Sequence, residues 1–143
     1  MHARVDKRYR LLRKIAVTHA AVADTTVFES LLDRTNTSRD VYADRGYPAA
    51  ERETTLKQAG WHVHIQRKGS ATKGISEAQK KRHRRIATPR ARVEHVFGAL
   101  AQMGGRLVRW MGIVRITFVL HLKAASYNLK RLVFLMEGGL APF

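Results

Sequence analysis

The sequence predicts an α/β domain built on a mixed sheet, and three observations favour this class. The chain has 143 residues, of which 45% are hydrophobic and 27% charged, so it has the size and composition of one folded domain. Short stretches in which apolar and polar residues alternate, typical of strands, lie between stretches with helical periodicity. Strands that alternate with helices along a chain indicate an α/β domain.

The first half of the chain is expected to open with a hairpin. Residues 3–9 and 11–18 are its two strands, because β-branched residues alternate with others in the second. Thr26 and Glu29 have the spacing of a capping box and predict the start of a short helix. Residues 41–44 are a further short strand, which ends at a turn rich in glycine and proline.

Helices dominate the rest of the chain. Residues 49–59 predict a helix that Gly60 ends, and residues 61–65 alternate like a strand. Ser76 and Gln79 form a second capping box, ahead of a basic helix.

Two more helices are predicted after that basic segment. Thr88 and Pro89 suggest a new helix start, with threonine as N-cap and proline in the first turn. Its apolar face is Val93, Val96, Phe97 and Leu100. Residues 113–136 are apolar-rich, but five basic residues interrupt them, so a core-packed helix is expected rather than a membrane span.

The charge balance points to a polyanionic partner. The chain has 27 Lys and Arg against 11 Asp and Glu, a net charge of +16, and no cysteine. Nucleic acid would relieve the self-repulsion of such a chain. The lack of cysteine excludes a disulfide framework, thiolate zinc ligands and a cysteine nucleophile.

Residues 66–92 hold the densest basic charge, with ten Lys or Arg and one acid. Within them, residues 80–85 include five Lys or Arg and one His, which would cover every side of a helix. This run could be a solvated helix face, but phosphate contact explains it better. The residues expected to contact DNA are Arg67, Lys68, Lys80, Lys81, Arg82, Arg84, Arg85 and Arg90.

Two carboxylates are candidates for chemistry. Asp44 ends a buried-looking strand, where ligands of α/β domains bind, although an Asp there also commonly starts a turn. Glu94 borders the predicted apolar helix face and could either pair with Arg90 at i, i+4 or ligate a metal. Carboxylates from two separate elements suit Mg²⁺ bound together with substrate phosphates. His62 and His64 share a strand face with no acid nearby in sequence and are expected to be half-exposed strand residues.

Three segments together resemble the DDE transposases of bacterial insertion sequences, in the groups named insertion sequence four and five. They are residues 41–47 (VYADRGY), 90–98 (RARVEHVFG) and 127–132 (YNLKRL). Their order and spacing carry the resemblance, which extends over most of the chain. The positions where the family has a tyrosine and a lysine around the Glu hold Ala87 and Ala101.

The resemblance implies a ribonuclease-H-like mixed sheet with flanking helices, and transposition as the function. In that family two Asp and one Glu bind two metal ions, Mg²⁺ or Mn²⁺, for cleavage and strand transfer of DNA phosphodiesters. Asp44 matches the second Asp, Glu94 the Glu, and Arg90 the arginine four residues before it. The implied partners are transposon ends and target DNA in the bacterial cytoplasm, beside the nucleoid, with no membrane; a homo-oligomer stays open.

The resemblance leaves the first catalytic Asp unaccounted for. Only two strands precede the short helix and Asp44, and Asp6 matches sequence of the second strand. We therefore expect residues 1–143 to be the C-terminal part of a transposase catalytic domain, with a basic loop and helix at 66–92, lacking the first strand and inactive alone. The alternative is a basic nucleic-acid-binding protein without catalysis, in which Asp44 and Glu94 are structural.

Overall fold

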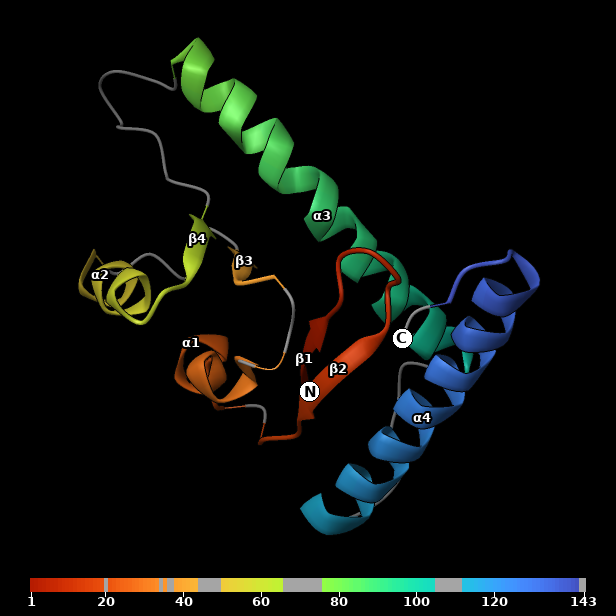
Figure 1. Cartoon of the computed structure of the whole chain (residues 1–143). Coiled ribbons are helices and arrows are strands. Elements are labelled where there is room, and N and C mark those ends of the chain that lie inside the picture. Colours follow the sequence, from red (N-terminus) through yellow and green to blue (C-terminus); the bar gives the residue numbers. More distant parts are fainter. Residues whose placement is uncertain are drawn as a thin grey trace. The chain divides into compact units, whose positions relative to one another are not determined.

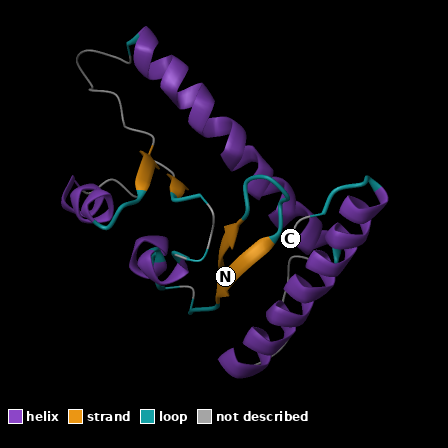
Figure 2. Ribbon diagram, in the orientation of Figure 1, coloured by secondary structure: helices purple, strands orange, loops and turns teal. Residues whose placement is uncertain are grey.

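The computed structural model describes residues 1–19, 21–33, 35, 38–43, 50–65, 76–104 and 112–141. Helices and short strands alternate along the chain, which confirms the α/β class (Figure 1, Figure 2). The chain divides into two compact units, Met1–Leu32 with Arg92–Phe143, and Asp33–Ala91.

The first unit begins with the predicted hairpin. Strands β1 (His2–Val5) and β2 (Leu12–Ala16) pair antiparallel and are shorter than expected. The connecting turn is closed by two backbone bonds, from Asp6 N to Leu11 O (2.8 Å) and from Arg10 N to Asp6 O (3.1 Å). Arg10 has a φ of 60°, a left-handed conformation that is uncommon for residues other than glycine.

A single helical turn follows the hairpin, and its predicted start is wrong. Helix α1 spans Asp24–Val27, and the 3₁₀ turn η1 spans Glu29–Leu31. Ala23 occupies the N-cap position of α1 without a side-chain cap bond. Because the helix begins two residues before Thr26, the Thr26 N–H already donates to Ala23 O inside it, and Thr26 cannot act as the cap.

The core of the first unit joins the hairpin to two helices. Its buried residues are Leu12 on β2, Val96 and Leu100 on helix α3 (Glu77–Gln102), and Ala124 on helix α4 (Ile113–Glu137). The bounds of α4 agree closely with the predicted helix at 113–136. Among the residues that the structure describes, no helix is long and apolar enough to span a membrane.

The second unit contains a parallel strand pair with a connecting helix. Strands β3 (Asp40–Ala43) and β4 (His62–Ile65) pair in parallel, and helix α2 (Ala50–Gln58) lies between them in sequence and contacts β4. Gly60 ends the helical stretch with a φ of 82°, and Trp61 N donates to Leu56 O. Val41, Ala43 and Ile65 are buried on one face of the pair, while Asp40, Tyr42 and His64 alternate with them.

The strands differ from the predicted single mixed sheet. The described strands form two two-stranded sheets, β1 with β2 and β3 with β4. Each pair has its own connection, a tight turn between β1 and β2 and a segment that contains α2 between β3 and β4. Each described strand pairs with one other described strand.

Helix α3 begins as predicted but does not restart. Ser76 Oγ accepts from Gln79 N (3.3 Å), and Ser76 N donates to Gln79 Oε1 (3.2 Å), which confirms the capping box. The predicted second start at Thr88 is wrong, since α3 continues through Pro89 and Thr88 Oγ1 donates back to Arg84 O (3.3 Å). Proline removes one backbone N–H donor from this helix of 26 residues. The helix continues because the backbone hydrogen bonds before and after Pro89 are retained.

Candidate functional site

The N-terminal half of α3 presents a dense cluster of exposed cations. Lys80, Lys81, Arg82, Arg84 and Arg85 are all exposed, and we call these five residues the α3 basic cluster. His83 is half-buried and Ile86 is 2% exposed, so the helix keeps one narrow inward side. The five cations span about 200° of the helix circumference, which is less than the every-side distribution that the composition of residues 80–85 predicted.

One acid, Glu77, forms an ion pair with a residue of this cluster. Lys80 Nζ lies 2.7 Å from Glu77 Oε1 on the preceding turn, and the Glu77 side chain is 88% exposed. An exposed pair of this kind contributes only a few tenths of a kcal/mol, because water screens it. The remaining four cations have no comparable neutralising acid on their own stretch of sequence, residues 78–93. A row of phosphates fits such a surface, since each contact releases counterions.

Glu94 lies farther along the same helix. It is exposed, whereas Val96 and Leu100, two and six residues later on the helix, are buried in the core of the first unit. Arg92, two residues earlier, donates from its guanidinium to Lys7 O in the hairpin turn (2.9 Å). The packing of this part of α3 therefore positions the Glu94 backbone, while its carboxylate faces solvent. Arg90 is half-buried on the same helix.

Three of the predicted site residues cannot be placed. Asp44, Arg67 and Lys68 lie outside the described residues. Strand β3, which precedes Asp44 in sequence, is described and ends at Ala43. The proximity of Asp44 and Glu94 therefore stays a prediction. Within the described ranges, no three His, Cys, Asp or Glu side chains gather closely enough to hold a metal ion.

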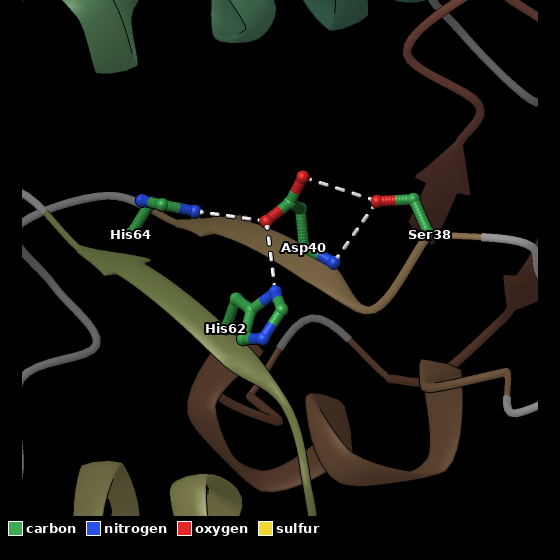
Figure 3. A network of polar contacts seen from close by, with 4 residues as sticks. All are labelled: Ser38, Asp40, His62 and His64. Carbon is green, nitrogen blue, oxygen red and sulfur yellow. Dashed lines mark hydrogen bonds and ion pairs between the residues drawn. The ribbon is translucent and has the colours of Figure 1, made fainter.

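The structure also reveals a polar network that the sequence did not suggest (Figure 3). Asp40 Oδ1 lies 3.0 Å from His64 Nε2 and 3.5 Å from His62 Nδ1, and Ser38 Oγ donates to Asp40 Oδ2 (3.1 Å). The ring of His64 stacks on Tyr42, with centroids 4.7 Å apart. The expectation that the two histidines lack a nearby acid is wrong, because the parallel register sets Asp40 opposite His62.

The network joins side chains of β3 and β4. Asp40 begins β3 and His62 begins β4, so the contacts lie at the end of β3 away from Ala43. The His62 side chain is 74% exposed and the His64 side chain 37%, as half-exposed strand residues should be. The only sequence signal for this network was the alternation of Asp40 with Tyr42 along the strand. The register of β3 against β4, which brings the histidines to Asp40, could not be obtained from the sequence.

The third motif has a structural role. Tyr127, Asn128 and Arg131, on the inner side of α4, hydrogen-bond backbone groups of the hairpin at Arg10, Leu12 and Tyr9, respectively. Burial raises the pKa of the Tyr127 hydroxyl, and the neighbouring charges of Arg131 and Arg10 counteract part of this rise. Residues 127–132 therefore dock α4 on the hairpin.

Comparison with known proteins identifies one family. A family model described as a transposase DDE domain matches residues 1–129. A transposase for insertion sequence element IS1106 from Neisseria meningitidis serogroup B is 32% identical over 130 residues, which cover 90% of this chain and 44% of that relative. The chain thus spans less than half the length of this relative. No solved structure matches the chain.

Proposed function

The chain belongs to the DDE-domain transposase family, and from that premise we propose that it is a DNA-binding part of a transposase catalytic domain. Its reaction would be metal-dependent cleavage and strand transfer of DNA phosphodiesters at transposon ends and target DNA. The proposal includes a ribonuclease-H-like fold for the whole catalytic domain, as the resemblance to the family implies.

The observation that carries DNA binding is the α3 basic cluster. Five cations within six residues are all exposed on one helix, and the same helix continues to Glu94, nine residues after Arg85. Nine residues are about 2.5 helical turns. A DNA backbone held by the cluster would bring phosphates toward the part of α3 that carries the carboxylate. Arg67, Lys68 and Arg90 are proposed to add phosphate contacts.

Asp44 and Glu94 are the proposed metal ligands, and the metal is Mg²⁺ or Mn²⁺. The support is chemical, because carboxylate oxygens are the ligands these hard cations prefer, and the segments 41–47 and 90–98 resemble family segments that carry the second Asp and the Glu. When bound, the metal would supply Lewis-acid stabilisation of the phosphoryl oxygens. The protein would hold the carboxylates in place and bind the DNA backbone through its arginines and lysines.

We propose that the 143 residues alone do not cleave DNA. A two-metal site clamps both the attacking and the leaving oxygen with ions about 3.5–4 Å apart. Two carboxylates among many cations hold one such ion weakly, and a third acid is needed for the pair. Weak Mn²⁺ binding that strengthens when DNA phosphates are present is the expected behaviour of this chain.

The test is a DNA-nicking assay with Mn²⁺ on two proteins, the chain as given and the chain extended at its N-terminus by a strand that bears an aspartate. The extended chain should cleave, and Asp44→Ala or Glu94→Ala should abolish its cleavage. Glu51→Gln, a change of an exposed acid on α2, is the matched control and should cleave normally.

The alternative, a basic nucleic-acid-binding protein without catalysis, predicts a different outcome. Both proteins would bind DNA, neither would cleave it, and the Asp44 and Glu94 variants would change only stability. The α3 basic cluster favours DNA binding in both cases, so only the dependence of cleavage on the two carboxylates separates the proposals.

A further inference from the structure

Helix α4 carries a row of exposed apolar side chains along its whole length. Its inner side packs in the first unit, where Ala124 and Leu135 are 7% and 2% exposed. Seven other large apolar residues of the helix are instead 56–78% exposed. The row, which we call the outer stripe, consists of Val114, Phe118, Leu122, Ala125, Leu129, Val133 and Met136.

The outer stripe is one continuous face of the helix. Its members follow at steps of four, four, three, four, four and three residues. At about 100° per residue these steps keep all seven within a sector roughly 100° wide. A contiguous apolar face of this size on a folded protein marks an interaction surface, whereas scattered exposed apolar residues do not.

The outer stripe is nearly symmetric when the helix direction is reversed. Leu122 lies three residues before Ala125 and Leu129 four after it; Phe118 lies seven before and Val133 eight after. Val114 and Met136 are each eleven residues from Ala125. Two antiparallel copies would therefore set each large side chain opposite another, with alanine at the crossing point, where a small residue lets two helices approach closely.

Charge complementarity selects the same arrangement. Arg115 and Glu137 are both exposed and border the same edge of the outer stripe, because 22 residues bring the helix back to within about 40°. They lie ten residues before and twelve residues after Ala125. In an antiparallel pair, residues on the same edge face each other, so Arg115 of each copy would meet Glu137 of the other. In a parallel pair, this edge of one copy would lie on the side of the contact opposite the same edge of the other copy, so Arg115 and Glu137 would not meet.

We propose that the outer stripe of α4 binds the outer stripe of a second copy of this chain, in an antiparallel and two-fold symmetric pair centred on Ala125. The contact is isologous, since each copy presents the same patch. The net charge of +16 opposes association of two copies, so screening by salt should strengthen the dimer. The proposal rests on α4 alone and is independent of the proposed function.

The first experiment measures the mass of the whole chain by sedimentation velocity as salt is raised from 0.1 to 1 M. The dimer fraction should rise with salt, the opposite of the salt response of DNA binding. Leu122→Glu, at a position that is 56% exposed and so outside the fold's core, should weaken dimerisation at least tenfold with an unchanged circular dichroism spectrum. A chain that stays monomeric at every salt concentration, or a Leu122→Glu dimer as tight as the unaltered one, overturns the proposal.

The second experiment tests the direction of pairing. Arg115→Glu should weaken the dimer several-fold, because it sets two acids together at each end. Adding Glu137→Arg should restore it, which a general loss of folding would not allow. Failure of the double exchange to restore the dimer overturns the antiparallel pairing.

Cross-linking tests the centre of the contact. The chain has no cysteine, so Ala125→Cys provides a single thiol, at the proposed two-fold axis. A short bis-maleimide should join two copies of this variant rapidly. Lys130→Cys is the matched control, exposed on the same helix about 140° away, and should cross-link at least tenfold more slowly. Equal rates for the two variants would place the contact elsewhere and overturn the proposal.

Discussion

The Asn128 side chain pairs with both backbone groups of Leu12, a residue 116 positions away in the chain. Leu12 N donates to Asn128 Oδ1, and Asn128 Nδ2 donates to Leu12 O, both at 2.9 Å. The amide thus acts as a neighbouring strand would toward β2, and it fixes α4 against the hairpin. Leu12 is itself part of the buried core, so the contact joins packing and hydrogen bonding at one place.

Replacing Asn128 should therefore destabilise the first unit. Asn128→Ala leaves the Leu12 N–H and C=O unpaired in a partly buried place, and we expect the free energy of unfolding to fall by about 1–3 kcal/mol. Urea unfolding followed by circular dichroism measures it. Ser126→Ala, an exposed position two residues away, is the control and should change stability by less than about 0.5 kcal/mol. Equal effects of both changes would refute a special role for the amide.

Arg10 tests the hairpin turn. Its φ of 60° favours glycine, so Arg10→Gly should leave the free energy of unfolding unchanged or raise it by up to about 1 kcal/mol. Arg10→Val should lower it by about 1–2 kcal/mol, because a β-branched side chain is strained in this conformation. Thermal unfolding of the two variants measures the difference. A glycine variant less stable than the valine variant would contradict the importance of this backbone conformation for the turn.

The Tyr127 hydroxyl predicts a loss of stability in alkali. Burial raises its pKa in the folded state above the ordinary value of 10.0, so the unfolded chain releases this proton more readily. The corresponding stability is fully present below pH 10 and is lost as the pH rises through the raised pKa. Tyr127→Phe removes this ionisation, and its hydrogen bond to Arg10 O, at a cost of about 1 kcal/mol at neutral pH. Unfolding by urea at pH 8 to 11 should show a smaller alkaline decline in Tyr127→Phe than in the unaltered chain; parallel curves would contradict the prediction.

Pro89 limits the stability of α3. Pro89→Ala restores a backbone donor in the helix interior and should raise the free energy of unfolding by about 1–3 kcal/mol. Thr88→Ala should have an effect below about 0.5 kcal/mol, because the hydroxyl bonds back to Arg84 O and caps nothing. Ser76→Ala, which removes a real cap, should cost about 1 kcal/mol. If Thr88→Ala costs as much as Ser76→Ala, the helix restarts at Thr88 in solution.

The α3 basic cluster should determine the salt dependence of DNA binding. Replacing its five residues by Ala should weaken binding and reduce the slope of log affinity against log salt by up to about 4.5. The control removes the same charge from five exposed residues spread over other elements, Arg8, Arg13, Lys14, Lys57 and Lys130. Fluorescence anisotropy with labelled duplex DNA measures both slopes. If the control lowers the slope as much as the cluster variant does, net charge alone governs binding.

Local signals in the sequence were sufficient for much of the fold. The capping box of Ser76 with Gln79, the periodicity of α4 and the glycine that ends the helical stretch after α2 all involve residues within a few positions of one another. Such contacts form wherever the short segment is placed, so periodicity and turn chemistry predict them. The two wrong helix starts, at Thr26 and Thr88, are also local. Each threonine is a residue type that suits an N-cap, but the helix begins before it and includes it.

The candidate site was predicted unevenly. The exposure of Lys80, Lys81 and Arg82 followed from composition, because a helix side with only cations has no reason to be buried. Asp44 and Glu94 were named from their positions, at a strand end and beside an apolar helix face, and from the resemblance to the transposase family. Their joint role in binding a metal stays a prediction. The contact of Asp40 with the two histidines needed the register of β3 against β4, which a strand's own sequence does not specify.

Tertiary structure alone decided which side of each element is covered. Helix α4 is apolar around much of its circumference, and its sequence does not say whether Ala124 or Leu122 faces the hairpin. The two bonds between Asn128 and Leu12 settle this, because they turn Ala124 inward and leave Leu122 56% exposed. Partners more than a hundred residues apart meet only when the whole unit closes, since the entropy of closing so long a loop is repaid only by many contacts made together.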